Sequence, residues 1–225
     1  MQDPAALPEI IPVKLGITTV FIVREEGVIL VDTGFPGSSD AIIHAMKEHG
    51  ISPRDIRLIV LTHGHADHAG SAADLRERTG AKVAIHAADV EMIRNGSQGV
   101  LRPICLSGRV FGIFFSRKEK SEFPPFDPDV FLVDGMSLEP YGISGTVLAT
   151  PGHTSGSVSI LLTSGDALAG DLLFAHLPAG NPGLPFWAED CNVVKESIRA
   201  LMSRHPARIY VAHGGMFPAD SITIR

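Results

Sequence analysis

Cysteine is scarce in this chain of 225 residues, which contains only Cys105 and Cys191. Two cysteines can form at most one disulfide, and this excludes a fold held together by a disulfide framework. Neither cysteine stands in a C-x-x-C motif or next to a histidine. We therefore expect both to be free thiols and neither to bind a metal ion.

The chain also lacks an excess of basic charge and any long apolar run. It has 19 Lys and Arg against 25 Asp and Glu, with a formal net charge of -6 and the two signs interspersed. Without a basic face, a protein lacks the attraction that holds it to nucleic-acid phosphates. No apolar run approaches the roughly 20 residues that span a bilayer, and the start, MQDPAALPEIIPVKL, has no signal-peptide pattern. We expect a cytoplasmic protein with neither a nucleic-acid nor a membrane partner.

The remaining composition is that of a globular domain, with 44% apolar and 20% charged residues. We expect residues 1–225 to form one domain with a large core. The patterning predicts strands at 10–15, 17–24, 28–31, 56–62, 81–86, 129–135, 144–153, 156–165, 167–174 and 207–215, and helices at 38–49, 70–80, 87–96 and 189–204. Strands in two groups, with helices in both halves, indicate an α/β (α+β) fold of two facing sheets covered by helices.

Residues 96–129 interrupt this pattern with several phenylalanines among Pro and Gly, which suits an inserted cap better than a regular layer. The aromatic residues could line a pocket for a small-molecule substrate, pack in the core or form a homodimer contact. These alternatives stay open. The candidate pocket residues are Met92, Phe111, Phe114, Phe115, Phe186 and Trp187.

The stretch THGHADHAG at 62–70 carries the strongest functional signal. His63 and His65 lie two residues apart in a loop after a buried strand, so both can reach one ion, whereas Asp67 and His68 lie where a helix begins and can turn to a neighbouring position. Imidazole nitrogens and carboxylate oxygens are ligands that zinc and similar divalent ions prefer. Four such ligands in one hexapeptide are more than one tetrahedral ion could easily take, which indicates two ions.

Three further segments each follow a β-rich run and supply another possible ligand. They are TPGHTSGS with His153, AGDLLF with Asp171 and VAHGG with His213. Loops at the ends of strands commonly carry function, because a rigid scaffold positions them. We therefore expect these three side chains to complete the metal site.

The ordered set VDTG, THGHADHAG, TPGHTSG, GDLLF and AHGG, between residues 31 and 215, resembles the motifs of the metallo-β-lactamase superfamily. The resemblance implies a four-layer αββα sandwich with a dinuclear metal site along one edge. By motif, it assigns His63, His65 and His153 to one ion, Asp67, His68 and His213 to the second, and Asp171 to a bridging position. Asp32 of VDTG would be a carboxylate that orients the metal-binding groups.

The charges of such a site favour hydrolysis. Two divalent ions offset by two carboxylates leave about two positive charges, which favours a bridging hydroxide near neutral pH. The hydroxide could attack a carbonyl or phosphoryl group, and Asp67 could pass a proton to the leaving group as a catalytic residue. We expect zinc, although iron and manganese accept the same ligands.

Departures from the branches of the superfamily narrow the choice of substrate. Asp171 argues against a β-lactam, because true β-lactamases lack this bridging aspartate. TPGHT and GD-LF resemble glyoxalase II, but only twelve residues follow His213, too few for its glutathione-binding region, and Phe174 stands where lactonases usually carry tyrosine. We expect a glyoxalase II-like or lactonase-like hydrolase of a small ester, thioester or lactone. The alternatives are a mononuclear iron oxygenase similar to persulfide dioxygenases and a phosphodiesterase.

Overall fold

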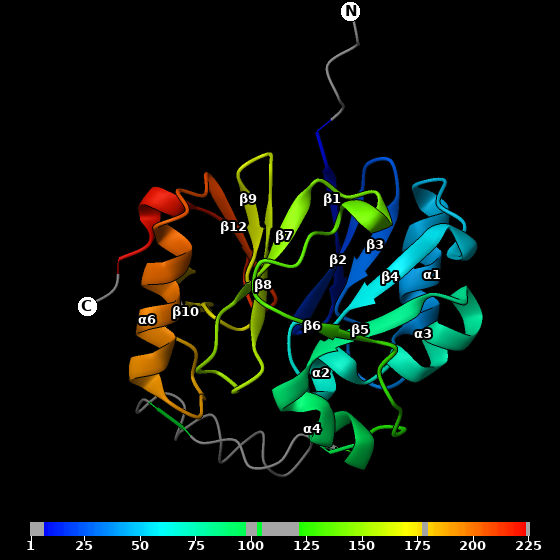
Figure 1. Ribbon diagram of the computed structural model, residues 1–225, viewed down its shortest axis with the longest axis horizontal. Coiled ribbons are helices and arrows are strands. Elements are labelled where there is room, and N and C mark those ends of the chain that lie inside the picture. Colours follow the sequence, from blue (N-terminus) through cyan, green and yellow to red (C-terminus); the bar gives the residue numbers. More distant parts are fainter. Residues whose placement is uncertain (1–6, 98–102, 105–121, 177–179, 224–225) are drawn as a thin grey trace, which may run out of the picture.

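Two β-sheets lie face to face, and helices cover the outer side of each (Figure 1). The structure is a computed structural model that describes residues 7–97, 103–104, 122–176 and 180–223. Within these residues the layers follow the order helix, sheet, sheet, helix. This is the four-layer αββα arrangement that the sequence predicts.

The first sheet joins an antiparallel meander to a parallel half. Its strands, in spatial order, are β1 (Glu9–Leu15), β2 (Thr18–Arg24), β3 (Val28–Val31), β4 (Ile56–Val60), β5 (Lys82–His86) and β6 (Val130–Leu132). β1, β2 and β3 pair antiparallel, whereas β3, β4, β5 and β6 are parallel to one another. Parallel strands end at the same edge, so the loops after β3, β4 and β5 lie side by side.

The second sheet is smaller and mostly antiparallel. Its strands, in spatial order, are β13 (Gly215–Pro218), β12 (Arg208–Val211), β9 (Asp166–Leu168), β8 (Val158–Leu162) and β7 (Gly145–Ala149). β9 and β12 form its parallel pair, which places the loops after them next to each other. A separate hairpin follows β9 and consists of β10 (Phe174–His176) and β11 (Asn181–Gly183).

The helices are short and have recognisable ends. They are α1 (Ser39–Glu48), α2 (Ala66–Ala69), α3 (Ala72–Thr79), α4 (Val90–Asn95) and α6 (Cys191–Met202). α3 ends at Gly80, whose φ of 75° is left-handed and suits glycine. α6 begins after Asp190, whose carboxylate accepts the backbone N–H groups of Asn192 and Val193. Among the described residues, no helix is long and apolar enough to cross a membrane.

The central strands are apolar on both faces because each face meets another layer. In β2, Val20 and Ile22 pack in the core under α1 and α3, whereas Phe21 and Val23 pack between the two sheets. A third core lies between the second sheet and α6, at the left of Figure 1. Side chains that alternate between two cores explain why these strands read as continuous apolar runs.

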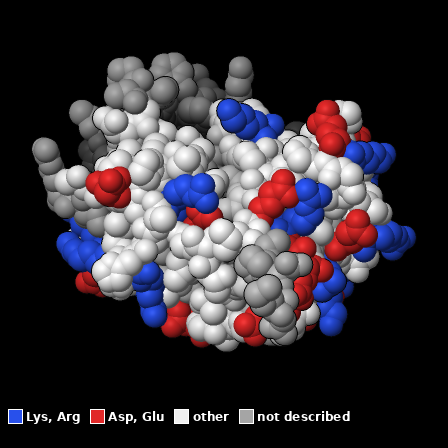
Figure 2. Space-filling view, turned by 90° about the horizontal axis from the view of Figure 1, so that it is seen from above, with Lys and Arg blue, Asp and Glu red and all other residues white. Residues whose placement is uncertain are grey.

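Charged side chains stand apart from these cores. On the face shown in Figure 2, Lys and Arg side chains lie among Asp and Glu side chains. This face therefore carries no extended basic patch. Several charged side chains of the described residues are paired, as Arg78 is with Asp40 and Asp74, and Arg94 with Asp127.

Three details of the sequence prediction need correction. The strand predicted across 167–174 is wrong, because β9 ends at Leu168 and the backbone turns at Gly170, where φ is 50°. The strands predicted at 144–153 and 207–215 likewise end early, at Ala149 and Val211. The sequence also missed β11 and β13, because NPG and GMFP contain no β-branched residue.

The predicted insert at 96–129 is described only at residues 96–97, 103–104 and 122–129. Phe111, Phe114, Phe115 and Cys105 lie outside the described residues. Of the described part, Ile104 donates its backbone N–H to the carbonyl of Phe186 over 3.1 Å. The other cysteine, Cys191, is a free thiol.

We expect the packing of α6 on the second sheet to contribute strongly to stability. Ile198 on α6 is fully buried, so Ile198→Ala should lower the free energy of unfolding by about 2–5 kcal/mol. Glu196→Ala, an exposed position on the same helix, should change it by less than about 0.5 kcal/mol. Urea denaturation of the two variants provides the comparison, and equal losses would contradict the packing described for α6.

Candidate metal centre

The polar loops of both sheets lie at the same edge of the molecule's two sheets. β4 is followed by the loop 62–70 that contains His63, and β7 is followed by the loop that contains His153. The parallel strands β9 and β12 are followed by Asp171 and His213. The two sheets thus supply opposite sides of a single site.

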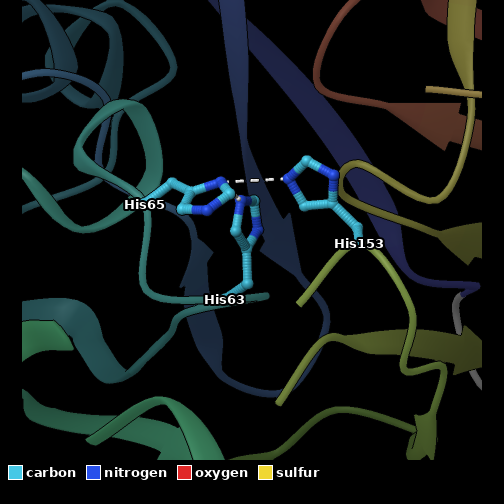
Figure 3. Close-up of side chains that lie close together, drawn as sticks. All are labelled: His63, His65 and His153. Atoms are coloured by element: carbon cyan, nitrogen blue, oxygen red, sulfur yellow. Dashed lines mark hydrogen bonds between the residues drawn. The ribbon is translucent and has the colours of Figure 1, made fainter. Parts of the chain in front are cut away.

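Three histidines form one cluster within this site. Nδ1 of His65 lies 3.0 Å from Nε2 of His63 and 3.0 Å from Nε2 of His153. Figure 3 shows the three rings converging from two loops that lie 88 residues apart in the sequence. All three side chains are buried. We call this set the three-histidine cluster.

A second cluster contains two histidines and two carboxylates, namely Asp67, His68, Asp171 and His213. Nε2 of His213 lies 3.1 Å from Oδ2 of Asp67 and 3.4 Å from Oδ1 of Asp171. Nε2 of His68 lies 3.3 Å from the same Oδ1. We call this set the mixed cluster.

Asp171 contacts both clusters through different oxygens. Its Oδ1 faces His68 and His213, whereas its Oδ2 lies 3.3 Å from Nε2 of His153 and 4.0 Å from Nε2 of His63. One carboxylate is therefore shared between two groups of ligands. This is the position expected of a residue that bridges two ions.

The donor atoms fit two divalent metal ions. Ligand atoms about 2.0–2.1 Å from a tetrahedral zinc ion lie about 3.3 Å from one another, close to the separations in both clusters. Nε2 of His68 and Oδ1 of Asp171 are buried without a hydrogen-bond partner in the described part of the chain. Buried polar atoms seldom lack a partner, and a cation held between these two atoms would supply one.

Hydrogen bonds on the far side of the rings fix which nitrogen faces the site. Nδ1 of His153 donates to the backbone carbonyl of Trp187 over 2.8 Å, and Nδ1 of His213 donates to the carbonyl of Ile17 over 2.9 Å. A carbonyl can only accept, so the proton sits on Nδ1 and Nε2 points to the cluster. Such outer contacts orient metal ligands and raise their basicity.

Asp32 likewise orients the ring of His68 through a hydrogen bond. Its Oδ2 accepts the Nδ1–H of His68 over 2.8 Å, while its Oδ1 accepts the backbone N–H of Thr62 over 2.8 Å. The Thr62 hydroxyl also contacts this carboxylate and lies 3.1 Å from Nδ1 of His63. Asp32 adopts a φ of 65°, a conformation that Asp tolerates better than most residues. It thus lies in the orienting position that the VDTG motif implies.

The histidines of the three-histidine cluster are neutral. Burial lowers the pKa of His153 and lowers that of His63 well below its usual value. Burial, together with the neighbouring His153, lowers the pKa of His65 to about 3. Neutral imidazole is the form that binds a metal ion, so this cluster is ready to bind at neutral pH.

In the mixed cluster, by contrast, the two histidines are protonated. Burial lowers the pKa of His213, but Asp171 and Asp67 outweigh it and raise this pKa to about 10. Burial is likewise outweighed at His68, where Asp171, Asp67 and Asp32 raise the pKa well above its usual value. The two histidines in turn hold the pKa of both Asp67 and Asp171 well below the usual range, against the effect of burial. Without a metal ion, the cluster is a set of buried ion pairs.

Aromatic side chains form a wall beside the two clusters. The ring of Phe174 lies 4.5 Å from that of His213, and the ring of Phe186 lies 5.5 Å from that of Phe174. Trp187 continues this wall, with its ring 5.8 Å from Phe186. The carbonyl of Trp187 also holds His153, so the backbone of this residue lies next to the site, and its role in a substrate pocket stays a prediction.

The sequence did not single out Asp89, although it lies close to the ligands. Asp89 follows β5 in the short turn 87–89 and is fully buried. Its carboxylate accepts hydrogen bonds from Gly64 and Thr154, which lie next to metal-ligand candidates in the chain. In the sequence, only its position shortly after the strand β5, which lies beside β4, could have indicated that Asp89 is near the ligands.

Comparisons with known proteins agree with this geometry. A family model described as the metallo-beta-lactamase superfamily matches residues 13–213. The chain is 27% identical over 206 residues to the probable metallo-hydrolase YflN of Bacillus subtilis (strain 168), covering 83% of this chain and 75% of that protein. It is 31% identical over 139 residues to a hydroxyacylglutathione hydrolase of Anaeromyxobacter dehalogenans (strain 2CP-C), covering 62% and 40%.

Solved structures add to the comparison at the level of the fold. The crystal structure of the BLEG-1 B3 metallo-beta-lactamase is 22% identical to this chain, with a TM-score of 0.71 and coverage of 95% of both chains. At this identity the likeness shows the fold alone.

We expect metal binding at the mixed cluster to release protons, because an ion has to displace those of His68 and His213. Both pKa values are raised, so between about pH 6 and about pH 8 the affinity of this cluster should increase with pH. The three-histidine cluster should bind with little pH dependence in that range. Calorimetric titration with Zn²⁺ in buffers of different ionisation enthalpy measures the protons released at each step. His213→Ala should reduce the release, and two proton-free steps in the unaltered protein would contradict the assignment.

Proposed function

Because the chain belongs to the metallo-β-lactamase superfamily, we propose that it is a dinuclear metal-dependent hydrolase of a small ester, thioester or lactone. The observation that most supports two metal ions is the Asp171 carboxylate, which has one oxygen beside each cluster. A site for a single ion has no need of a carboxylate divided in this way. Zinc is the metal that we propose for both positions, since the donors are imidazole nitrogens and carboxylate oxygens.

Two bound divalent ions would supply hydroxide at neutral pH and polarise the carbonyl group that it attacks. The protein's own part is to hold the seven ligands in place and to handle the proton of the leaving group. Asp67 suits the second task, because its Oδ2 lies 3.1 Å from Nε2 of His213 and its side chain is 15% exposed. As a carboxylate beside the clusters, it could take the proton given up when a bound water becomes hydroxide and pass it to the departing oxygen or sulfur.

The proposed substrate class follows from the surroundings of the clusters. The aromatic wall of Phe174, Phe186 and Trp187 offers an apolar surface on which an acyl group could pack. The name hydroxyacylglutathione hydrolase, carried by one relative, supports acyl chemistry. Asp171 also supports a substrate other than a β-lactam, because true β-lactamases lack the aspartate of this motif.

We expect the metal-loaded protein to hydrolyse at least one acyl substrate in a panel of S-acyl glutathione, acyl-homoserine lactone and aryl ester. Asp171→Ala should abolish this activity because it removes the shared ligand. Asp67→Asn should lower kcat by about 100-fold or more, since an amide cannot transfer the proton. Asp220→Ala, which removes an exposed carboxylate outside both clusters, should leave the rates unchanged.

Two further compounds, bis-nitrophenyl phosphate and glutathione persulfide, are tested beside this panel because their turnover could contradict the proposal. Cleavage of bis-nitrophenyl phosphate with no turnover of any acyl compound would identify a phosphodiesterase. One iron per chain, with oxygen uptake on glutathione persulfide and no hydrolysis, would identify an oxygenase. Metal content and oxygen consumption are therefore measured alongside hydrolysis.

A further inference from the structure

Asp89 occupies a place in the parallel sheet equivalent to that of Asp32. The adjacent parallel strands β3, β4 and β5 are followed by Asp32, by the histidine loop 62–70 and by Asp89 respectively. The histidine loop therefore lies between two buried carboxylates. Asp32 binds His68 of the mixed cluster, and Asp89 lies on the other side of the loop.

The Asp89 carboxylate joins the two loops that form the three-histidine cluster. Its Oδ2 accepts the backbone N–H of Gly64 over 2.9 Å and the hydroxyl proton of Thr154 over 2.7 Å. Its Oδ1 accepts the backbone N–H of Gly156 over 2.9 Å. Gly64 stands between His63 and His65, and Thr154 directly follows His153. One side chain thus fastens the backbone on both sides of the cluster.

The surroundings of Asp89 leave it little freedom to move. It is fully buried, and a Cβ atom at Gly156 would lie only 2.4 Å from its Oδ1. A Cβ atom at Gly64 would lie 2.9 Å from Cβ of Met92. The loop of Gly156 therefore approaches the turn 87–89, and the loop of Gly64 approaches α4, as closely as glycine permits. The three hydrogen bonds to Asp89 set the separation of the two loops.

We propose that Asp89 is a positioning residue that sets the metal affinity of the three-histidine cluster, as Asp32 sets that of the mixed cluster. The hydrogen bonds of Asp89 go to Gly64, Thr154 and Gly156, so it acts through the loops that carry the ligands. The inference rests on the proposed function only in that two ions bind. Residues that orient metal ligands from outside typically contribute roughly 10- to 100-fold in affinity.

Zinc affinity in two backgrounds that each retain one cluster tests this assignment. His213→Ala leaves the three-histidine cluster complete, and His65→Ala leaves the mixed cluster complete. In the His213→Ala background, adding Asp89→Asn should weaken Zn²⁺ binding by roughly 10- to 100-fold, whereas adding Asp220→Ala, at an exposed position outside both clusters, should leave it unchanged. In the His65→Ala background, Asp89→Asn should have little effect on Zn²⁺ binding, whereas Asp32→Asn should weaken it because His68 loses its acceptor. Competition with a chromophoric chelator measures each affinity without any substrate.

Two further variants separate positioning from general stability. Thr154→Val removes one donor to Asp89 and should weaken the three-histidine cluster in the His213→Ala background, while Thr154→Ser, which keeps the hydroxyl, should restore it. Thermal unfolding of the metal-free proteins shows whether each variant folds. Thr154→Val keeps the test open if Asp89→Asn fails to fold.

The results distinguish this inference from the proposed function. Equal weakening of both clusters by Asp89→Asn, or unchanged affinity at the three-histidine cluster, would overturn the role of Asp89. Failure to hydrolyse any acyl compound would overturn the proposed function and leave the difference in zinc affinity intact. A cobalt-substituted His213→Ala protein gives a second readout, because its absorption bands should shift on Asp89→Asn and not on Asp220→Ala.

Discussion

Five imidazole rings and two carboxylates share one largely buried volume, and the surrounding fold has to keep them there. Burial penalises every charged form, and the neutral rings of the three-histidine cluster bear this out in their lowered pKa values. The mixed cluster compensates instead by pairing, with His68 and His213 against Asp67 and Asp171. Two neighbouring clusters thus satisfy the same constraint by opposite means.

The way in which the rings are held follows from that constraint. A histidine that presents one ring nitrogen to a metal ion carries its proton on the other, and that N–H needs an acceptor on the far side of the ring. The acceptors come from separate parts of the chain: a carboxylate after β3, a carbonyl before β2 and a carbonyl before α6. The architecture supplies them because both sheets end at the same edge. Rigid layers on either side then prevent the rings from turning.

The sequence predicted the layers and gathered the seven ligand candidates, and the physical reason is local in both cases. The continuous apolar runs of β2 and β4 indicated that both faces of the first sheet are covered by other layers. The polar motifs directly after strands indicated that the ligand candidates lie at one edge of the sheets. Asp89 was missed because a lone Asp in AADVEMIRNG looks like a helix-start residue, and its partners Gly64 and Thr154 reach it only in the folded chain. An acceptor such as the backbone carbonyl of Ile17 cannot be recognised in a sequence, because every residue has such a carbonyl.

The bond between His213 and Ile17 also bears on how the protein is assembled. These two residues are 196 positions apart, and Thr19 next to them donates its backbone N–H to the carbonyl of Ala212. Contacts of such sequence separation form late, because closing a long loop costs entropy before the contact repays it. The ligands of the three-histidine cluster all lie between residues 63 and 153, whereas the mixed cluster needs His213, next to the last strands. A chain shortened before β12 would therefore keep the ligands of the first cluster and lose one ligand of the second.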